Sequence, residues 1–143
     1  MSWDDTKLVE SLRAIPLFEH LDDLALARVA EVAKPVELTA GHVLMNAGQE
    51  GAGLLVIQEG NVAVEVGGHS IDFMPGEFFG ELALLVDGLV HTGRVRATTA
   101  VRCLAIGRDD FTGLLKDEPQ FAINMLRVLA RRLADTDKLL AQK

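Results

Sequence analysis

The segment Phe79-Gly80-Glu81-Leu82-Ala83-Leu84-Leu85 decides the fold of this chain, and His91-Thr92-Gly93 begins ten residues after Glu81. A glycine directly before a run of good helix formers is typical of a tight turn that opens a short helix. The start of a helix presents free backbone N–H groups and the positive end of the dipole, which together favour an anion. Glu81 falls in that first turn, where its carboxylate can accept hydrogen bonds from hydroxyl groups.

This segment resembles the phosphate-binding cassette of the cyclic nucleotide-binding domain family. In the family a glycine and a glutamate are followed by a short helix, a loop and an arginine beside a serine or threonine. Aligned without gaps to the catabolite activator protein type of cassette, Gly80 and Glu81 match the glycine and the glutamate. Thr92 matches the small hydroxyl residue, and His91 stands where the family has arginine.

The resemblance implies a binding site for cyclic AMP or cyclic GMP, with no other cofactor. In the family the cassette backbone and the arginine hold the cyclic phosphate, and the glutamate binds the ribose hydroxyl. On the last helix, Arg132 and Thr136 match positions that contact the base in the similar activators, and Asp137 replaces a small polar residue. The expected ligand-binding residues are Phe79, Gly80, Glu81, Leu82, Ala83, His91, Thr92, Gly93, Arg132 and Thr136.

Histidine at position 91 is the departure from the family pattern that bears most on function. Arginine offers a phosphate a fixed fork and a permanent charge, whereas histidine has one donor when neutral and two when charged. Losing two charge-assisted hydrogen bonds of roughly 1.5–3 kcal/mol each weakens binding by about two to four powers of ten. Alternatively, a phosphate recruits the charged form of His91, and binding then depends on pH.

Two functions therefore stay open at this point. One is a regulatory module that senses cyclic nucleotide and signals to an unidentified partner protein. The other is a degenerate domain that has lost the ligand and acts as an interaction or dimerisation module. A different anionic or apolar ligand in the same pocket is a third interpretation.

Neither neighbouring arginine is an easy substitute for the missing one. Val95 and Ala97 are the expected inward positions of their strand, so alternation sends Arg94 and Arg96 outward. A β-bulge would be needed to reverse that parity.

Composition narrows the class of protein. The 143 residues are 49% hydrophobic, enough for one domain with a core, and the net charge of −7 argues against nucleic acid as a partner. The acidic start and the lack of an apolar run near 18 residues predict neither export nor membrane insertion, hence a cytoplasmic protein.

The single cysteine, Cys103, is expected to be a small buried residue in a strand. The histidines form no metal-ligand cluster and no nucleophile–base motif is present, so we expect neither a metal nor an enzyme.

Hydrophobic periodicity gives the order of elements. Leu8, Leu12 and Ile15 form one helical face, and a second apolar stripe that includes Leu24 runs over 21–33. Short apolar or alternating runs separated by glycine turns then predict an antiparallel sandwich or barrel. The runs are 36–38, 42–45, 53–58, 61–66, 69–73, 94–98 and 102–106. Within 61–66, three valines at positions 62, 64 and 66 are expected to share one buried face.

Helices are predicted again over 108–115 and from Pro119 to about Leu140. The resemblance covers nearly the whole chain and implies a single cyclic nucleotide-binding-like domain over 1–143. This comprises an N-terminal helical segment (1–35), a mainly-β antiparallel β-roll or jelly roll (36–107, cassette-like at 79–92) and C-terminal helices (108–143). Because the chain ends with this helix, we expect no direct DNA binding. The leucine stripe of the last helix, at positions 126, 129, 133 and 140, either packs on the roll or pairs with a second copy, which suggests a homodimer.

Overall fold

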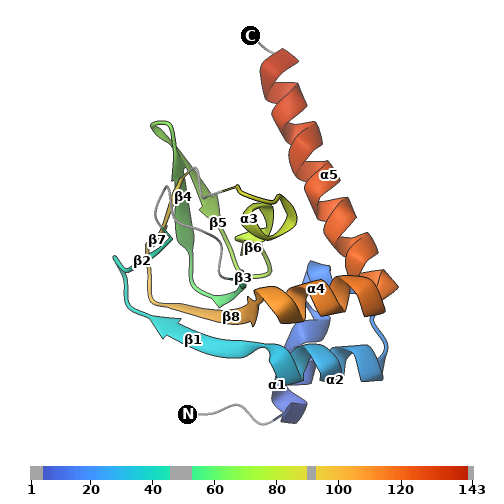
Figure 1. Cartoon of the computed structure of the whole chain (residues 1–143). Helices are drawn as coiled ribbons and strands as arrows, with labels where there is room; N and C mark the ends of the chain where they lie inside the picture. Colours follow the sequence, from blue (N-terminus) through green and yellow to red (C-terminus); the bar gives the residue numbers. More distant parts are fainter. Residues whose placement is uncertain (1–4, 46–52, 90–92, 142–143) are drawn as a thin grey trace.

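The fold is that of a computed structural model, which describes residues 5–45, 53–89 and 93–141. A β-roll is flanked at one end by helices from both halves of the chain, and the last helix projects away from this body (Figure 1). The helices are α1 (Asp5–Arg13), the 3-10 helix η1 (Pro16–Phe18), α2 (Asp23–Val32), α3 (Glu81–Leu85), α4 (Arg108–Asp117) and α5 (Pro119–Ala141). None of these helices is long and apolar enough to span a bilayer.

The strands in the described part of the chain form two four-stranded sheets. They are β1 (Lys34–Leu38), β2 (Val43–Met45), β3 (Gly53–Glu59), β4 (Val62–Val66), β5 (His69–Phe73), β6 (Phe78–Phe79), β7 (Arg94–Ala97) and β8 (Val101–Gly107). One sheet has the order β1-β8-β3-β6 and the other β2-β7-β4-β5, with antiparallel pairing throughout. The predicted antiparallel β-roll with flanking helices is therefore confirmed.

Strand β6 was missed from the sequence because two residues are too short to show an alternation. Its residues, Phe78 and Phe79, pair with Val56 and Leu55 of β3 and are both buried. This short strand leads directly into α3, so it fixes the cassette to the edge of the first sheet.

The burial pattern expected for β4 is only partly right. Val62 is buried, but Val66 is exposed and the small side chain of Ala63 is buried. The end of the β4–β5 hairpin extends beyond the rest of the roll (Figure 1), and Val66, the last residue of β4, is 43% exposed and is not part of the roll core. Because β4 lies between β5 and β7, the methyl group of Ala63 is shielded on its own sheet.

Two hydrophobic cores hold the domain. The helical core joins α1, η1, α2, α4 and α5 to the first sheet, and it contains the predicted face of Leu8, Leu12 and Ile15. The smaller roll core lies between the sheets and contains Met45, Ile57, Val62, Phe79, Val95, Ala97, Val101 and Cys103. The expected stripe on α2 is wrong at Leu24, which is 84% exposed because it faces away from the helical core.

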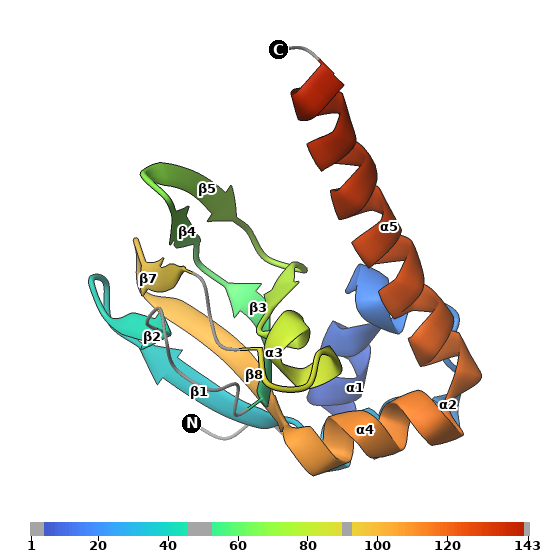
Figure 2. The same cartoon turned by 45° about the horizontal axis from the view of Figure 1, so that its top comes forward.

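Helix α5 packs on the other helices through its first half. Phe121 stacks on Phe18 of η1 and meets Phe111 of α4 edge-on, each at a ring-centroid distance of 6.0 Å. The second half projects beyond the body in both views (Figures 1 and 2). Three leucines of the predicted stripe, Leu126, Leu133 and Leu140, are 67%, 63% and 60% exposed, whereas Leu129 is partly buried against the helical core.

Asn124 ties α5 to the N-terminal segment. Its buried amide nitrogen donates hydrogen bonds to the carbonyl oxygens of Leu17 (2.9 Å) and Glu19 (2.8 Å), and its oxygen accepts from Gln120 (2.9 Å). The side chain thus satisfies two carbonyls where η1 ends, a place where the backbone has no regular partner.

Asn124→Ala is expected to lower the free energy of unfolding by about 2 kcal/mol, because two carbonyl groups lose their donor inside the protein. Gln120→Ala, which removes only the outer hydrogen bond to Asn124, is the control and should cost less than about 1 kcal/mol. Urea unfolding followed by circular dichroism measures both. Equal losses in the two variants would contradict this role for Asn124.

Candidate functional site

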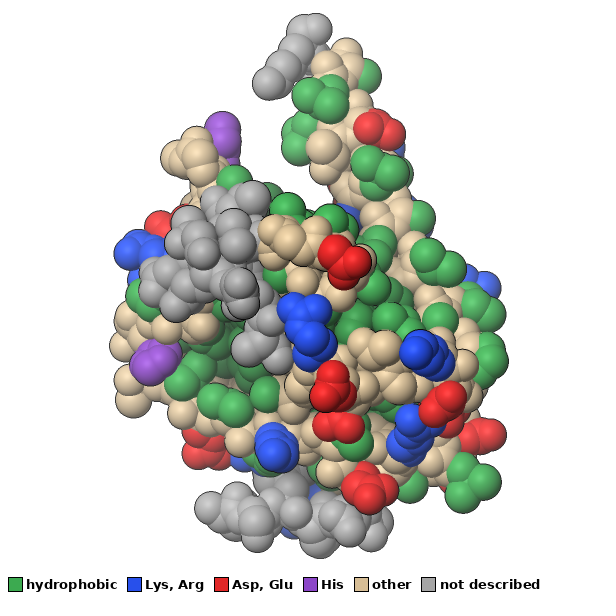
Figure 3. Space-filling model, viewed as in Figure 1, with side chains coloured by type: hydrophobic (Ala, Val, Ile, Leu, Met, Phe, Trp, Pro, Cys, Tyr) green, Lys and Arg blue, Asp and Glu red, His purple; other side chains and the backbone are tan. Residues whose placement is uncertain are grey.

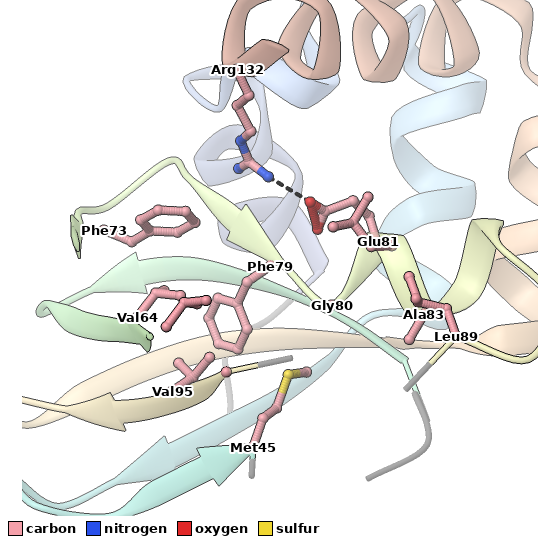
Figure 4. A pocket seen from close by; sticks show the side chains of 13 residues that line it. Met45, Val64, Phe73, Phe79, Gly80, Glu81, Ala83, Leu89, Val95 and Arg132 are labelled. Carbon is pink, nitrogen blue, oxygen red and sulfur yellow. Dashed lines mark hydrogen bonds and ion pairs between the residues drawn. The ribbon is translucent and has the colours of Figure 1, made fainter. Parts of the chain in front are cut away.

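A cavity of about 260 Å³ opens between the second sheet, the start of α3 and one side chain of α5 (Figure 4). Most of its wall is apolar and comes from the roll. The lining residues are Met45, Val64, Val66, Phe73, Phe79, Gly80, Glu81, Leu82, Ala83, Leu89, Gly93, Val95 and Arg132.

Gly80 shapes the entrance of α3. It is the N-cap residue of the helix and has φ 96° and ψ −6°, a left-handed conformation that side chains disfavour. A Cβ atom at this position would lie 2.6 Å from the carbonyl oxygen of Gly53 and 2.9 Å from Cε of Met45. The predicted tight glycine turn before a short helix is therefore present, and only glycine fits it.

Glu81 is the first residue of α3 and the only acidic residue among the described residues that line the cavity. It is 5% exposed, and burial raises the pKa of its carboxyl above the ordinary value of 4.5. The guanidinium of Arg132 acts in the opposite direction and favours the charged form. Glu81 is thus a buried hydrogen-bond acceptor beside an apolar cavity, where a bound hydroxyl group can reach it.

Arg132 crosses from α5 to the roll and is held by four groups. Its Nη1 lies 2.6 Å from Oε1 of Glu81, and its Nη2 donates to the carbonyl oxygen of Phe78 at 2.7 Å. The guanidinium also lies 4.4 Å from the ring centroid of Phe78 and 5.1 Å from that of Phe73. This cation–π arrangement fixes the direction of the side chain. Sequence reasoning placed Arg132 near a base and missed the pairing with Glu81.

The structure brings together most of the expected ligand-binding residues. Phe79, Leu82, Ala83 and Gly93 line the same cavity as Gly80, Glu81 and Arg132. Thr136 does not line it, since its hydroxyl donates to the carbonyl oxygen of Arg132 on the same helix at 3.0 Å. His91 and Thr92 lie outside the described residues, so their assigned roles stay predictions.

The apolar wall was not anticipated from the sequence. Met45, Phe73 and Leu89 carry no motif and are recruited from separate elements by the folding of the roll. The one available signal was strand parity, which places Val64 and Val66 on one face of β4 and correctly predicts that Val95 points inward.

The two arginines of β7 point away from the site, as predicted. Arg94 pairs with Glu65 at 3.1 Å and Arg96 approaches the same carboxylate at 3.5 Å, while Val95 and Ala97 are buried. Among the described residues of the cavity wall, Arg132 is therefore the only lysine or arginine.

Metal and thiol chemistry find no support in the part of the chain that the structure describes. No group of three or more His, Cys, Asp or Glu side chains converges there. Cys103 is fully buried in β8, and burial raises the pKa of its thiol to about 11, so it is a structural residue as expected.

Comparison with known proteins settles the family. A family model described as the cyclic nucleotide-binding domain matches residues 35–118, which include the cassette, the roll and α4. The chain belongs to the cyclic nucleotide-binding domain family. The match spans more than half of the chain and contains every described cavity residue except Arg132.

The relatives of this chain include a channel and a transcriptional regulator. The chain is 32% identical over 119 residues to a cyclic nucleotide-gated potassium channel of Rhizobium etli, covering 83% of this chain and 33% of that protein. It is 30% identical over 140 residues to a CRP-like cAMP-activated global transcriptional regulator of Mycobacterium tuberculosis, covering 92% of this chain and 61% of that protein. The chain thus spans about one third to three fifths of these relatives.

Solved structures give the same fold. The catabolite activator protein of Thermus thermophilus superposes with a TM-score of 0.78 at 28% identity, covering 88% of this chain and 62% of that chain. The N-terminal domain of a transcriptional regulator from Streptomyces coelicolor superposes with a TM-score of 0.67 at 34% identity, covering 90% and 95%.

Arg132→Gln is expected to extend to higher pH the range over which the free energy of unfolding falls as pH rises. Because burial raises the pKa of Glu81, the unfolded chain loses this proton first, and stability declines as pH rises above 4.5. Without Arg132 the pKa rises further, so the decline extends to higher pH. Urea unfolding between pH 4.5 and pH 8 measures this. Arg127→Gln, on an exposed position of the same helix, is the control, and identical pH profiles for the two variants would contradict the pairing.

Proposed function

We propose that this chain is a regulatory module that binds cyclic AMP or cyclic GMP at the Gly80–Glu81 cavity and passes the change to a partner protein. The observation that carries the proposal is the buried carboxylate of Glu81, set on a glycine turn at the mouth of an apolar cavity, within a chain of this family. No catalytic step is assigned to the module. We place it in the cytoplasm and assign it no direct contact with DNA.

Each part of the cavity suits one part of the nucleotide. The carboxylate of Glu81 accepts hydrogen bonds from the ribose hydroxyl, because it is the one anionic acceptor in the described wall. The apolar side chains of Val64, Phe73 and Val95 exclude water from the sugar and base. His91 and Thr92 are assigned to the cyclic phosphate on the basis of the family pattern, together with the backbone of Leu82 and Ala83.

Arg132 gives the ligand a way to act on α5. The ribose hydroxyl and the guanidinium compete for the same carboxylate, 2.6 Å from the arginine in this structure. Binding therefore changes the interactions that hold the middle of α5 against the roll. Since the first half of α5 is fixed by Phe121 and Asn124, the response is directed to its projecting second half.

We also propose that the exposed leucine row of α5 forms a homodimer contact. Leu126, Leu133 and Leu140 recur every seven residues, which is the spacing of one core position of a two-stranded coiled coil, whereas Leu129 is partly buried against the helical core. Hydrophobic side chains are visible along α5 in the space-filling view (Figure 3). A projecting helix with a row of exposed leucines favours a second copy of the same helix as the occupant.

Calorimetric titration with cyclic AMP and cyclic GMP at pH 6 and pH 8 tests the ligand. We expect binding that strengthens at pH 6, because the charged imidazole of His91 then offers the phosphate two donors. His91→Arg should tighten binding at pH 8 by about two powers of ten or more and remove the pH dependence.

The opposite result would be equally informative. A folded protein that gives no heat at either pH with millimolar ligand, and that His91→Arg does not rescue, would leave an interaction or dimerisation module without cyclic nucleotide binding.

Leu133→Lys is expected to weaken the dimer at least about tenfold, because it places a charge in the centre of the apolar seam. Light scattering or sedimentation over a range of concentrations measures the mass. Ala134→Lys adds the same charge one position away, outside the seam, and should leave the mass unchanged. A wild-type monomer at high concentration would refute the homodimer.

A further inference from the structure

The short helix α3 is held by two arginines, one from each C-terminal helix. Arg132 of α5 bonds to the side chain of Glu81, the first residue of α3. Arg108, the first residue of α4, donates from Nη2 to the carbonyl oxygen of Ala83 at 3.2 Å. The two bonds lie on successive parts of the same five-residue helix.

The bond from Arg108 matters because α3 cannot hold its position alone. Isolated helices shorter than about 12 residues are marginal in water, so a five-residue helix depends on its surroundings. The last carbonyl groups of a helix also have no intrahelical partner. The carbonyl of Leu82 accepts from the amide of Val86, and the carbonyl of Ala83 accepts from Arg108. A cation at this end of the helix satisfies that carbonyl by a charge-assisted bond.

Ala83 links this bond to the ligand site. Its side chain is buried and lines the cavity, whereas its carbonyl oxygen accepts the bond from Arg108. Arg108 itself is not among the cavity residues. It therefore acts on the cavity through the position of α3 and touches no ligand.

The start of α4, which carries Arg108, is anchored to the first sheet and to α5. Arg108 follows β8 without an intervening residue, and Gly107 at the end of β8 pairs with Gly53 of β3. Helix α4 packs on α5 through the edge-on contact of Phe111 with Phe121. Arg108 and Arg132 thus belong to two helices that are packed together, and both reach the same small helix.

We infer that Arg108 is a positioning residue that sets the place of α3 in the ligand site and couples that helix to α4. The inference rests on the proposed function for its link to ligand, but the placement of α3 is a property of the protein alone. When a ligand shifts α3, the bond between Arg108 and Ala83 carries the shift to the start of α4.

Hydrogen exchange of the protein without ligand tests the placement. In Arg108→Gln, the hydrogen-bonded amides within residues 81–86, such as that of Val86, which donates to Leu82, are expected to exchange about tenfold faster, with the β3 and β8 amides unchanged. Arg108→Lys keeps the charge and one donor and should fall between this variant and the wild type. The control is Arg28→Gln, because Arg28 bonds to Asp117 (2.9 Å) and Glu118 at the opposite end of α4 and leaves α3 untouched.

Two exchange results would overturn the inference. One is unchanged exchange over 81–86 in Arg108→Gln. The other is faster exchange spread evenly over the whole domain, which would mean a general loss of stability.

Titration with cyclic AMP tests the coupling. The Kd of Arg108→Gln is expected to rise about three- to tenfold, with loss of the ligand-induced protection of amides 108–117, whereas Arg28→Gln keeps both. Ligand-induced protection of α4 that persists in Arg108→Gln would refute the coupling. Absence of binding by the wild-type protein would instead defeat the proposed function, and the exchange of 81–86 would still decide the role of Arg108.

Discussion

A carboxylate buried at the edge of an apolar cavity needs a partner, and the packing of this domain follows from how Glu81 obtains one. Burial disfavours the charged form, and the cation that compensates comes from α5, 51 residues later in the chain. Phe73 and Phe78 provide the faces on which the guanidinium rests as it reaches Glu81. The need of the buried Glu81 carboxylate for a cationic partner therefore joins the roll, the cassette and the C-terminal helix.

The pairing of Glu81 with Arg132 also links the ligand site to α5. A hydroxyl group that takes over the Glu81 carboxylate changes the environment of Arg132, and Arg132 is the contact between the middle of α5 and the roll. Asn124 and the ring of Phe121 keep the first two turns of α5 in place. In the proposed function, ligand chemistry at one carboxylate is translated into freedom or restraint of the projecting part of α5.

Local patterns predicted the elements well, because they depend on neighbours in the chain. The glycine turn at Gly80, the inward parity of Val95 and the buried face of the first helix all follow from sequence spacing. The cavity wall did not follow, since Met45, Phe73 and Leu89 meet only after the two sheets have packed. Leu24 was misread because an apolar residue can complete a periodic pattern and still face solvent, and Val66 is exposed because it lines the open cavity. The pairing of Arg132 with Glu81 is a long-range contact that no local pattern encodes.

The division into two hydrophobic cores has a consequence for how such a domain can diverge. Met45, Phe79 and Val95 belong to the roll core and also form the wall of the cavity, so changing them alters stability and ligand choice together. The helical core around Phe18, Phe111 and Phe121 contributes no residue to the lining of the cavity. Substitutions that conserve its volume can therefore accumulate there without altering what the pocket accepts. Selection on ligand choice and selection on folding thus meet in the roll core, whereas the helical core is shaped mainly by selection on folding.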